Sequence, residues 1–88
     1  MKRTYAVLIE KGKRSYGAFA PDLPGCVAVA RTLKEVQRLI REAVEFHIEG
    51  MMLHGEEIPE ATTQCDSVEI NLTKIEKAMQ RESRAASR

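Results

Sequence analysis

The segment from Thr32 to Gly55 restricts the possible folds more than any other part of the sequence, because it predicts one long amphipathic helix. Apolar side chains recur every three or four residues from Leu33 onward, and charged side chains occupy the opposite arc. Thr32 and Glu35 have the spacing of a capping box, and Gly55 is a typical residue at a helix C-terminus. We therefore expect a helix over roughly residues 33–54 that lies on a β-sheet.

Three short apolar segments precede this helix and are typical of β-strands. Thr4–Glu10 and Ser15–Ala20 are joined by a KGKR turn and predict a hairpin, and Cys26–Ala30 follows a proline-rich loop. After the helix, Ser67–Leu72 alternates apolar and polar residues and predicts a fourth strand. A right-handed crossover would place it parallel beside the first strand. We expect an α+β, β-β-β-α-β domain with sheet order 3-2-1-4.

The C-terminal part predicts a short helix and a basic tail. Thr73 and Glu76 form a second capping box, and Glu82 interrupts the apolar stripe, so we expect the helix to fray there. The chain then divides into residues 1–72, the main domain, and residues 73–88, the helix and frayed tail.

Self-association is a further expectation, because one helix covers only one face of a sheet that carries apolar side chains on both faces. A chain of 88 residues also has room for only a modest core. We expect a homo-oligomer, either a dimer or a tetramer.

The charge pattern and the apolar runs limit the classes of partner. A formal net charge of +1 excludes a chain-wide field for nucleic acid, so any such contact depends on a local patch. No apolar run approaches the length of a membrane span, and the N-terminal segment meets charge too early for a secretory signal. We expect a cytoplasmic protein without membrane contact.

Few residues suggest catalysis. Cys26 with His47 or His54 would be the pair for thiol chemistry, but Cys26 begins an apolar strand, where a buried thiol is common, and neither histidine has metal-ligand spacing. Cys65 lies far from Cys26, which favours two reduced thiols. A metal-dependent nuclease would depend on Asp22, with no carboxylate cluster on the strands. We predict no catalytic residue, metal or cofactor.

The sequence from Tyr16 to Glu60 resembles the HicB antitoxin family and its stand-alone HicB-like relatives. The resemblance rests on the P-D-L-P-G-C run at Pro21–Cys26 and on the helix start, followed by Glu42, Ala43, Gly55, Ile58 and Pro59. It implies a partial, catalytically inactive RNase H-like fold. It also implies binding to a HicA toxin, a small mRNA-cleaving ribonuclease whose active site is blocked. Family members commonly have glycine where this chain has Ala30.

The proline-rich loop is the candidate contact surface for such a toxin. Two prolines fix its shape, which lowers the entropy lost on binding. The candidate partner-binding residues are Tyr16, Pro21, Asp22, Leu23, Pro24 and Gly25. The alternative is that the loop is only a rigid connection between strands.

The basic tail supports a second hypothesis, a nucleic-acid-binding repressor that acts as a homo-oligomer. Its candidate contacts are Lys74, Lys77, Arg81, Arg84 and Arg88. The segment VEINLTKIEKAMQRES resembles the strand and first helix of a ribbon-helix-helix domain, but the sequence stops before a second helix. The tail also has no aromatic side chain for base stacking, which favours the alternative of a frayed, solvated terminus.

Overall fold

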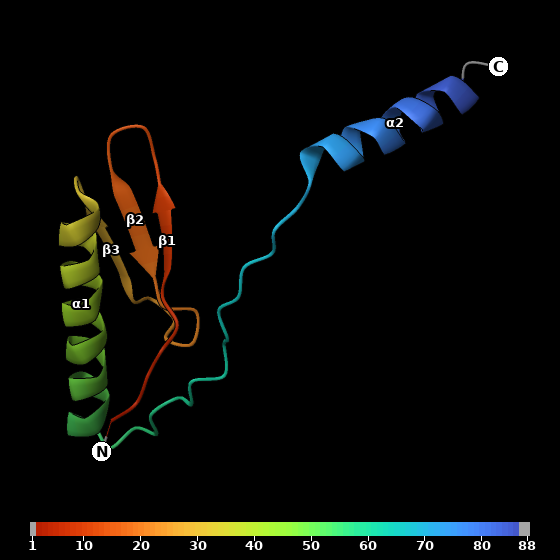
Figure 1. Cartoon of the computed structure of the whole chain (residues 1–88). Coiled ribbons are helices and arrows are strands. Elements are labelled where there is room, and N and C mark those ends of the chain that lie inside the picture. The colour runs from red at the N-terminus through yellow and green to blue at the C-terminus, as the bar shows by residue number, and fades with distance from the viewer. Residues whose placement is uncertain (1, 87–88) are drawn as a thin grey trace.

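The computed structural model describes residues 2–86, and the side chains of residues 2–81. Three antiparallel strands form one sheet in the order β1-β2-β3, and the longer helix packs on one of its faces (Figure 1). The elements are β1 (Leu8–Lys11), β2 (Tyr16–Phe19), β3 (Val27–Ala30), α1 (Leu33–Leu53) and α2 (Leu72–Ala86). The predicted α+β class and the antiparallel β-β-β-α order are confirmed.

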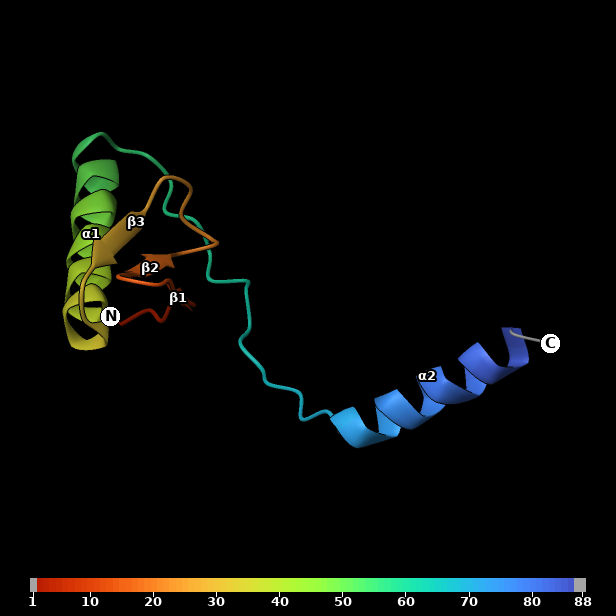
Figure 2. The same cartoon turned by 90° about the horizontal axis from the view of Figure 1, so that it is seen from above.

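The prediction of a fourth strand over Ser67–Leu72 is wrong. Within the described residues the sheet ends at β1, which pairs only with β2, and the chain between Gly55 and α2 forms no strand. A segment of alternating apolar and polar residues forms a strand only where it can pair with the edge of a sheet. This linker does not pair with β1, because it leaves the sheet on the side opposite α1 (Figures 1 and 2). The first strand is also shorter than predicted, because residues 4–7 pair with no strand.

The core lies between α1 and the strands β2 and β3. Ala18 and Ala30 face the helix and are buried, and their small side chains let the helix approach closely. Val36 and Ile40 fill the space from the helix side, and Leu23 closes one end with no exposed surface. The core is small, as the length of the chain predicts.

Both predicted caps of α1 are present. The Thr32 side chain accepts a hydrogen bond from the Glu35 amide at 3.1 Å. At the other end Gly55 adopts φ 68°, and the Glu56 amide donates to the Met51 carbonyl at 2.9 Å. This is a Schellman ending, which needs a left-handed residue and therefore favours glycine.

Helix α2 lies apart from the rest of the fold, and among the described residues it contacts no other helix or strand (Figure 1). The Asn71 side chain accepts from the Lys74 amide at 3.1 Å, so Asn71 caps the helix in place of the predicted Thr73. The helix continues to Ala86, past Glu82 where we expected fraying. The Cα radius of gyration is 19.9 Å, against about 12 Å for a compact chain of this length. Neither described helix is long and apolar enough to cross a membrane.

Candidate functional site: the proline loop and the open sheet face

The loop between β2 and β3 consists of two successive tight turns. The Leu23 amide donates to the Ala20 carbonyl at 3.1 Å, and the Cys26 amide donates to the Leu23 carbonyl at 3.1 Å. In the second turn Pro24 is followed by Gly25 at φ 83°, the arrangement that a type II turn requires. The loop therefore has a fixed shape, set by its prolines and by one left-handed glycine.

Asp22 connects this loop to the linker that follows α1. Its two carboxylate oxygens accept four hydrogen bonds of 2.8–3.0 Å from the backbone amides and hydroxyls of Thr62 and Thr63. These bonds, led by those from Thr63, lower the pKa of the Asp22 carboxyl below its usual value. Asp22 thus fixes the middle of the linker to the loop.

Substituting Asp22→Asn is expected to loosen the linker, because asparagine loses one of the two acceptor oxygens. Hydrogen exchange at the amides of Thr62 and Thr63 should become severalfold faster, while exchange in α1 stays unchanged. In the unsubstituted chain the anchor is intact at neutral pH and is lost as the pH falls through the lowered pKa of Asp22. Asp66→Asn is a matched control, since Asp66 bonds only the neighbouring Ser67 amide. If hydrogen exchange at both threonine amides is unchanged in Asp22→Asn, then Asp22 does not anchor the linker.

Within the described residues no helix or strand covers the face of the sheet opposite α1, and its side chains are apolar except for Glu10. Leu8, Phe19 and Val27 are cross-strand neighbours in one row of that face, and Val29 lies in the next row. Their exposed fractions are 44%, 37%, 64% and 69%. A contiguous exposed apolar patch is typical of a protein-protein contact surface. We call these four residues the open sheet face.

The loop and the open sheet face adjoin each other. Phe19 ends β2 and Val27 begins β3, so the row that contains both lies directly beside the loop. Pro24 and Gly25 are exposed at the loop tip, and a Cβ at Gly25 would meet no atom within 4 Å. Together they offer a rigid, largely apolar surface.

The structure places the other predicted loop contacts differently. Leu23 has no exposed surface and belongs to the core, and Pro21 is half-buried. Tyr16 lies at the far end of β2 and faces α1, with the Lys11 ammonium 6.0 Å from its ring centre. The loop tip and Tyr16 are therefore not brought together.

The predicted nucleic-acid contacts lie on α2 as far as they are described. Lys74, Lys77 and Arg81 are exposed and fall on one face of the helix, opposite Ile75 and Met79. Arg84 is described only in its backbone, and Arg88 lies outside the described residues. The described cations thus form a basic stripe on an amphipathic helix.

The thiols and histidines are not assembled into a site. Cys26 is buried, and burial raises the pKa of its thiol, which keeps it protonated at neutral pH. Cys65 is exposed, and both thiols are free. His54 contacts the Gly50 carbonyl through Nδ1 at 2.8 Å, next to the helix end. The described residues contain no group of three or more side chains suited to hold a metal ion.

The sequence predicted an apolar sheet face without a helix, but this face was linked only to self-association, and none of its four residues was among the candidate partner contacts. In VAVA at Val27–Ala30 the larger residues alternate with alanines, and the alanines are the ones under α1. Larger side chains on the face without a helix indicate a partner outside the chain.

Comparisons with known proteins bear on the family of this chain. A family model described as "HicB_like antitoxin of bacterial toxin-antitoxin system" matches residues 5–79. An uncharacterized 14.9 kDa protein from the rep-hol intergenic region of Haemophilus phage HP1 is 42% identical over 57 residues, which are 65% of this chain and 43% of that protein. The chain thus spans less than half of the phage protein.

Two further relatives are UPF0150 proteins. The one from Thermoplasma acidophilum is 39% identical over 56 residues, covering 62% of this chain and 81% of the relative. The one from Synechocystis is 38% identical over 56 residues, covering 62% of this chain and 71% of the relative. No solved structure was found to match the chain.

Proposed function

This chain belongs to the HicB-like antitoxin family of bacterial toxin-antitoxin systems, and on that premise we propose that it is a non-catalytic antitoxin that neutralises a HicA-type, mRNA-cleaving ribonuclease. It acts in the cytoplasm by covering the active-site surface of the toxin. We further propose that the fold is a partial RNase H-like domain without the catalytic carboxylates.

The open sheet face is the observation that carries this proposal. Four large, exposed apolar side chains on one face of a hydrogen-bonded sheet are suited to exclude water from a protein partner. A steric inhibitor needs such a surface and needs no catalytic group. Pro24 and Gly25 extend it at one end and are positioned by the two turns.

The rigidity of the loop favours tight binding. A type II turn with Pro24 and Gly25 is formed before the partner arrives, so little conformational entropy is lost on association. Leu23 contributes from below, because its buried side chain holds the loop against the core. Asp22 contributes by tying down the linker, which keeps it at the side of the loop.

Affinity capture from the native cell tests this function. The tagged chain should retain a small basic ribonuclease at near-equal stoichiometry, and the ribonuclease should be inactive on mRNA until the complex is dissociated. A capture that yields no ribonuclease, or yields one that stays fully active in the complex, contradicts the proposal.

The basic stripe of α2 supports a second candidate function, a homo-oligomeric repressor that binds nucleic acid. Lys74, Lys77 and Arg81 can contact successive phosphates, and such binding weakens steeply with salt. Affinity for promoter DNA at two salt concentrations, with and without Lys77→Gln, tests it. Tight, sequence-specific binding would favour the repressor, whereas weak binding to any DNA would reject it.

A further inference from the structure

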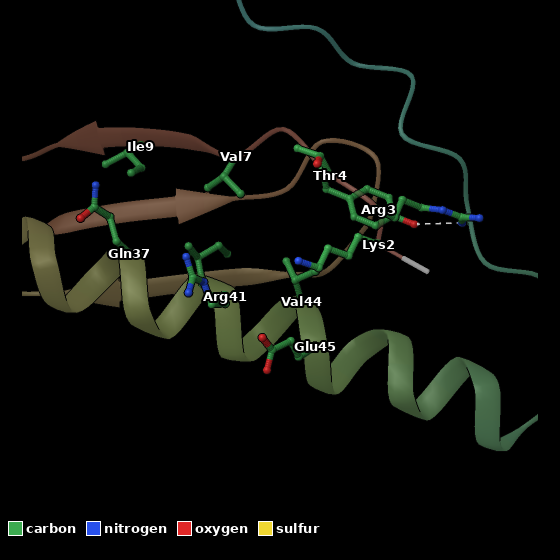
Figure 3. A pocket seen from close by; sticks show the side chains of 11 residues that line it. Lys2, Arg3, Thr4, Val7, Ile9, Gln37, Arg41, Val44 and Glu45 are labelled. Carbon is green, nitrogen blue, oxygen red and sulfur yellow. Dashed lines mark hydrogen bonds between the residues drawn. The ribbon is translucent and has the colours of Figure 1, made fainter.

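A long groove lies between α1 and the open edge of β1. Its main part has a volume of about 830 Å³ and continues into a smaller part of about 390 Å³ toward the end of α1. Val7 and Ile9 line one wall, and Ile40 and Val44 line the other (Figure 3). The groove exists because α1 packs over β3 and β2 but not over β1. We call it the α1–β1 groove.

The edge of β1 beside this groove has unpaired backbone groups. The Gly12 amide donates to the Ser15 carbonyl at 2.8 Å, which fixes the hydrogen-bonded pairs of the hairpin. Because such pairs alternate along an antiparallel ladder, Ile9 and Lys11 direct their N–H and C=O groups away from β2. A strand edge with an apolar floor beside it accepts a further strand.

The segment Ser67–Leu72 has the side-chain pattern that this position requires. Its apolar residues alternate with polar ones, so all of them can face the groove floor at once. In the structure they are exposed to 83% at Val68, 61% at Ile70 and 64% at Leu72. Residues 67–71 precede α2 and Leu72 begins it, so Leu72 would leave the helix on pairing; the resulting six residues are a typical strand length.

Charge favours the same pairing. The lining of the groove carries three cations, Lys2, Arg3 and Arg41, beside the carboxylate of Glu45 (Figure 3) and, in the smaller part, that of Glu49. The incoming segment carries Asp66 and Glu69 and no cation between residues 66 and 72. Cations along an edge discourage neutral or basic strands and attract an acidic one.

A chain's own segment is not positioned to fill its own groove. Thr62 and Thr63 are fixed to Asp22, and the linker then runs on the side of the sheet opposite α1 (Figures 1 and 2). The groove opens on the α1 side, and the next residues lead away from it toward α2. A second chain has no such restriction.

We propose that Ser67–Leu72 of a second copy of this chain adds to the β1 edge and fills the α1–β1 groove. A two-fold axis makes the exchange mutual, so that each chain receives the strand of the other and the pair closes as a dimer. This inference does not depend on the identity of any toxin.

Cysteine cross-linking between two differently tagged copies tests the proposal. One copy carries Glu10→Cys and the other Glu69→Cys, both in a Cys65→Ser background, and a short bifunctional maleimide joins thiols on adjacent strands. Glu10 is on β1 and exposed, as is Glu69, so neither change disturbs the core. Cys26 remains buried and does not compete. The expected product is the mixed dimer of the two tags.

Three other outcomes would overturn the proposal. If a chain that carries both cysteines forms an intramolecular cross-link and no mixed dimer is found, the strand adds to the β1 edge of its own chain. Cross-links only between two Glu69→Cys copies place the segments against each other and away from β1. If no cross-link forms, Ser67–Leu72 of a second copy does not bind in the α1–β1 groove.

A substitution at the strand provides an independent readout. Ile70→Lys should shift the chain from dimer to monomer in light scattering, because a lysine cannot be buried on the groove floor. Met79→Lys on α2 is the matched control, since Met79 is 63% exposed, close to the 61% of Ile70. If Met79→Lys alone dissociates the dimer, α2 and not the groove joins the copies.

Discussion

Substituting both Val27→Glu and Val29→Glu is expected to weaken toxin binding by about a hundredfold or more. Both valines are more than 60% exposed on the open sheet face, at 64% and 69%. In a complex, two carboxylates would be buried against an apolar partner surface, which carries a large desolvation cost. Isothermal titration of the toxin with each variant gives the ratio of dissociation constants directly.

The fold of this double variant should be intact, because exposed positions away from the core change stability little, by about 0.5 kcal/mol. Phe46→Glu is the matched control: it is 78% exposed, lies on α1 and is not part of the open sheet face. Phe46→Glu should bind the toxin normally. Full affinity in the double valine variant would place the toxin elsewhere on the chain.

The second large effect is expected from Leu23→Ala, which should lower the free energy of unfolding by about 2–5 kcal/mol. Leu23 has no exposed surface and packs with Val36 and Ile40 in a core that has few other large side chains. A chain with so small a core has little stability to lose. Urea unfolding followed by far-UV circular dichroism measures the change.

Leu53→Ala removes the same atoms from a side chain that is 78% exposed, and it should cost far less than Leu23→Ala. The Leu23→Ala variant should also bind toxin more weakly in proportion to its unfolded fraction. Equal losses of stability in the two variants would mean that Leu23 is not the core residue that holds the loop.

Local signals made the helical part of this fold predictable. Thr32 and Gly55 satisfy the ends of α1 through bonds within a few residues, so the sequence pattern contains all that is needed. The β2–β3 loop was predictable for the same reason, since Pro24 and Gly25 select their turn type.

Strands depend on partners that a sequence pattern does not contain. Ser67–Leu72 has the alternation of a strand, but in this structure the linker leads it away from the open β1 edge of its own chain (Figure 1). The direction of a loop side chain is similarly non-local: Leu23 was a candidate contact and lies in the core, whereas Val27 and Val29 were not candidates and are exposed. Which of these side chains is buried depends on the position of α1, which lies in a second layer of the fold.

The most direct test of the central claim is a titration of RNA cleavage. A fixed amount of the captured ribonuclease is mixed with increasing amounts of the intact chain, and cleavage of a labelled mRNA is followed. The account predicts that cleavage stops near molar equivalence, and that the Val27→Glu, Val29→Glu variant leaves it active. Cleavage that continues at saturating antitoxin, or inhibition that the double variant retains, would contradict it.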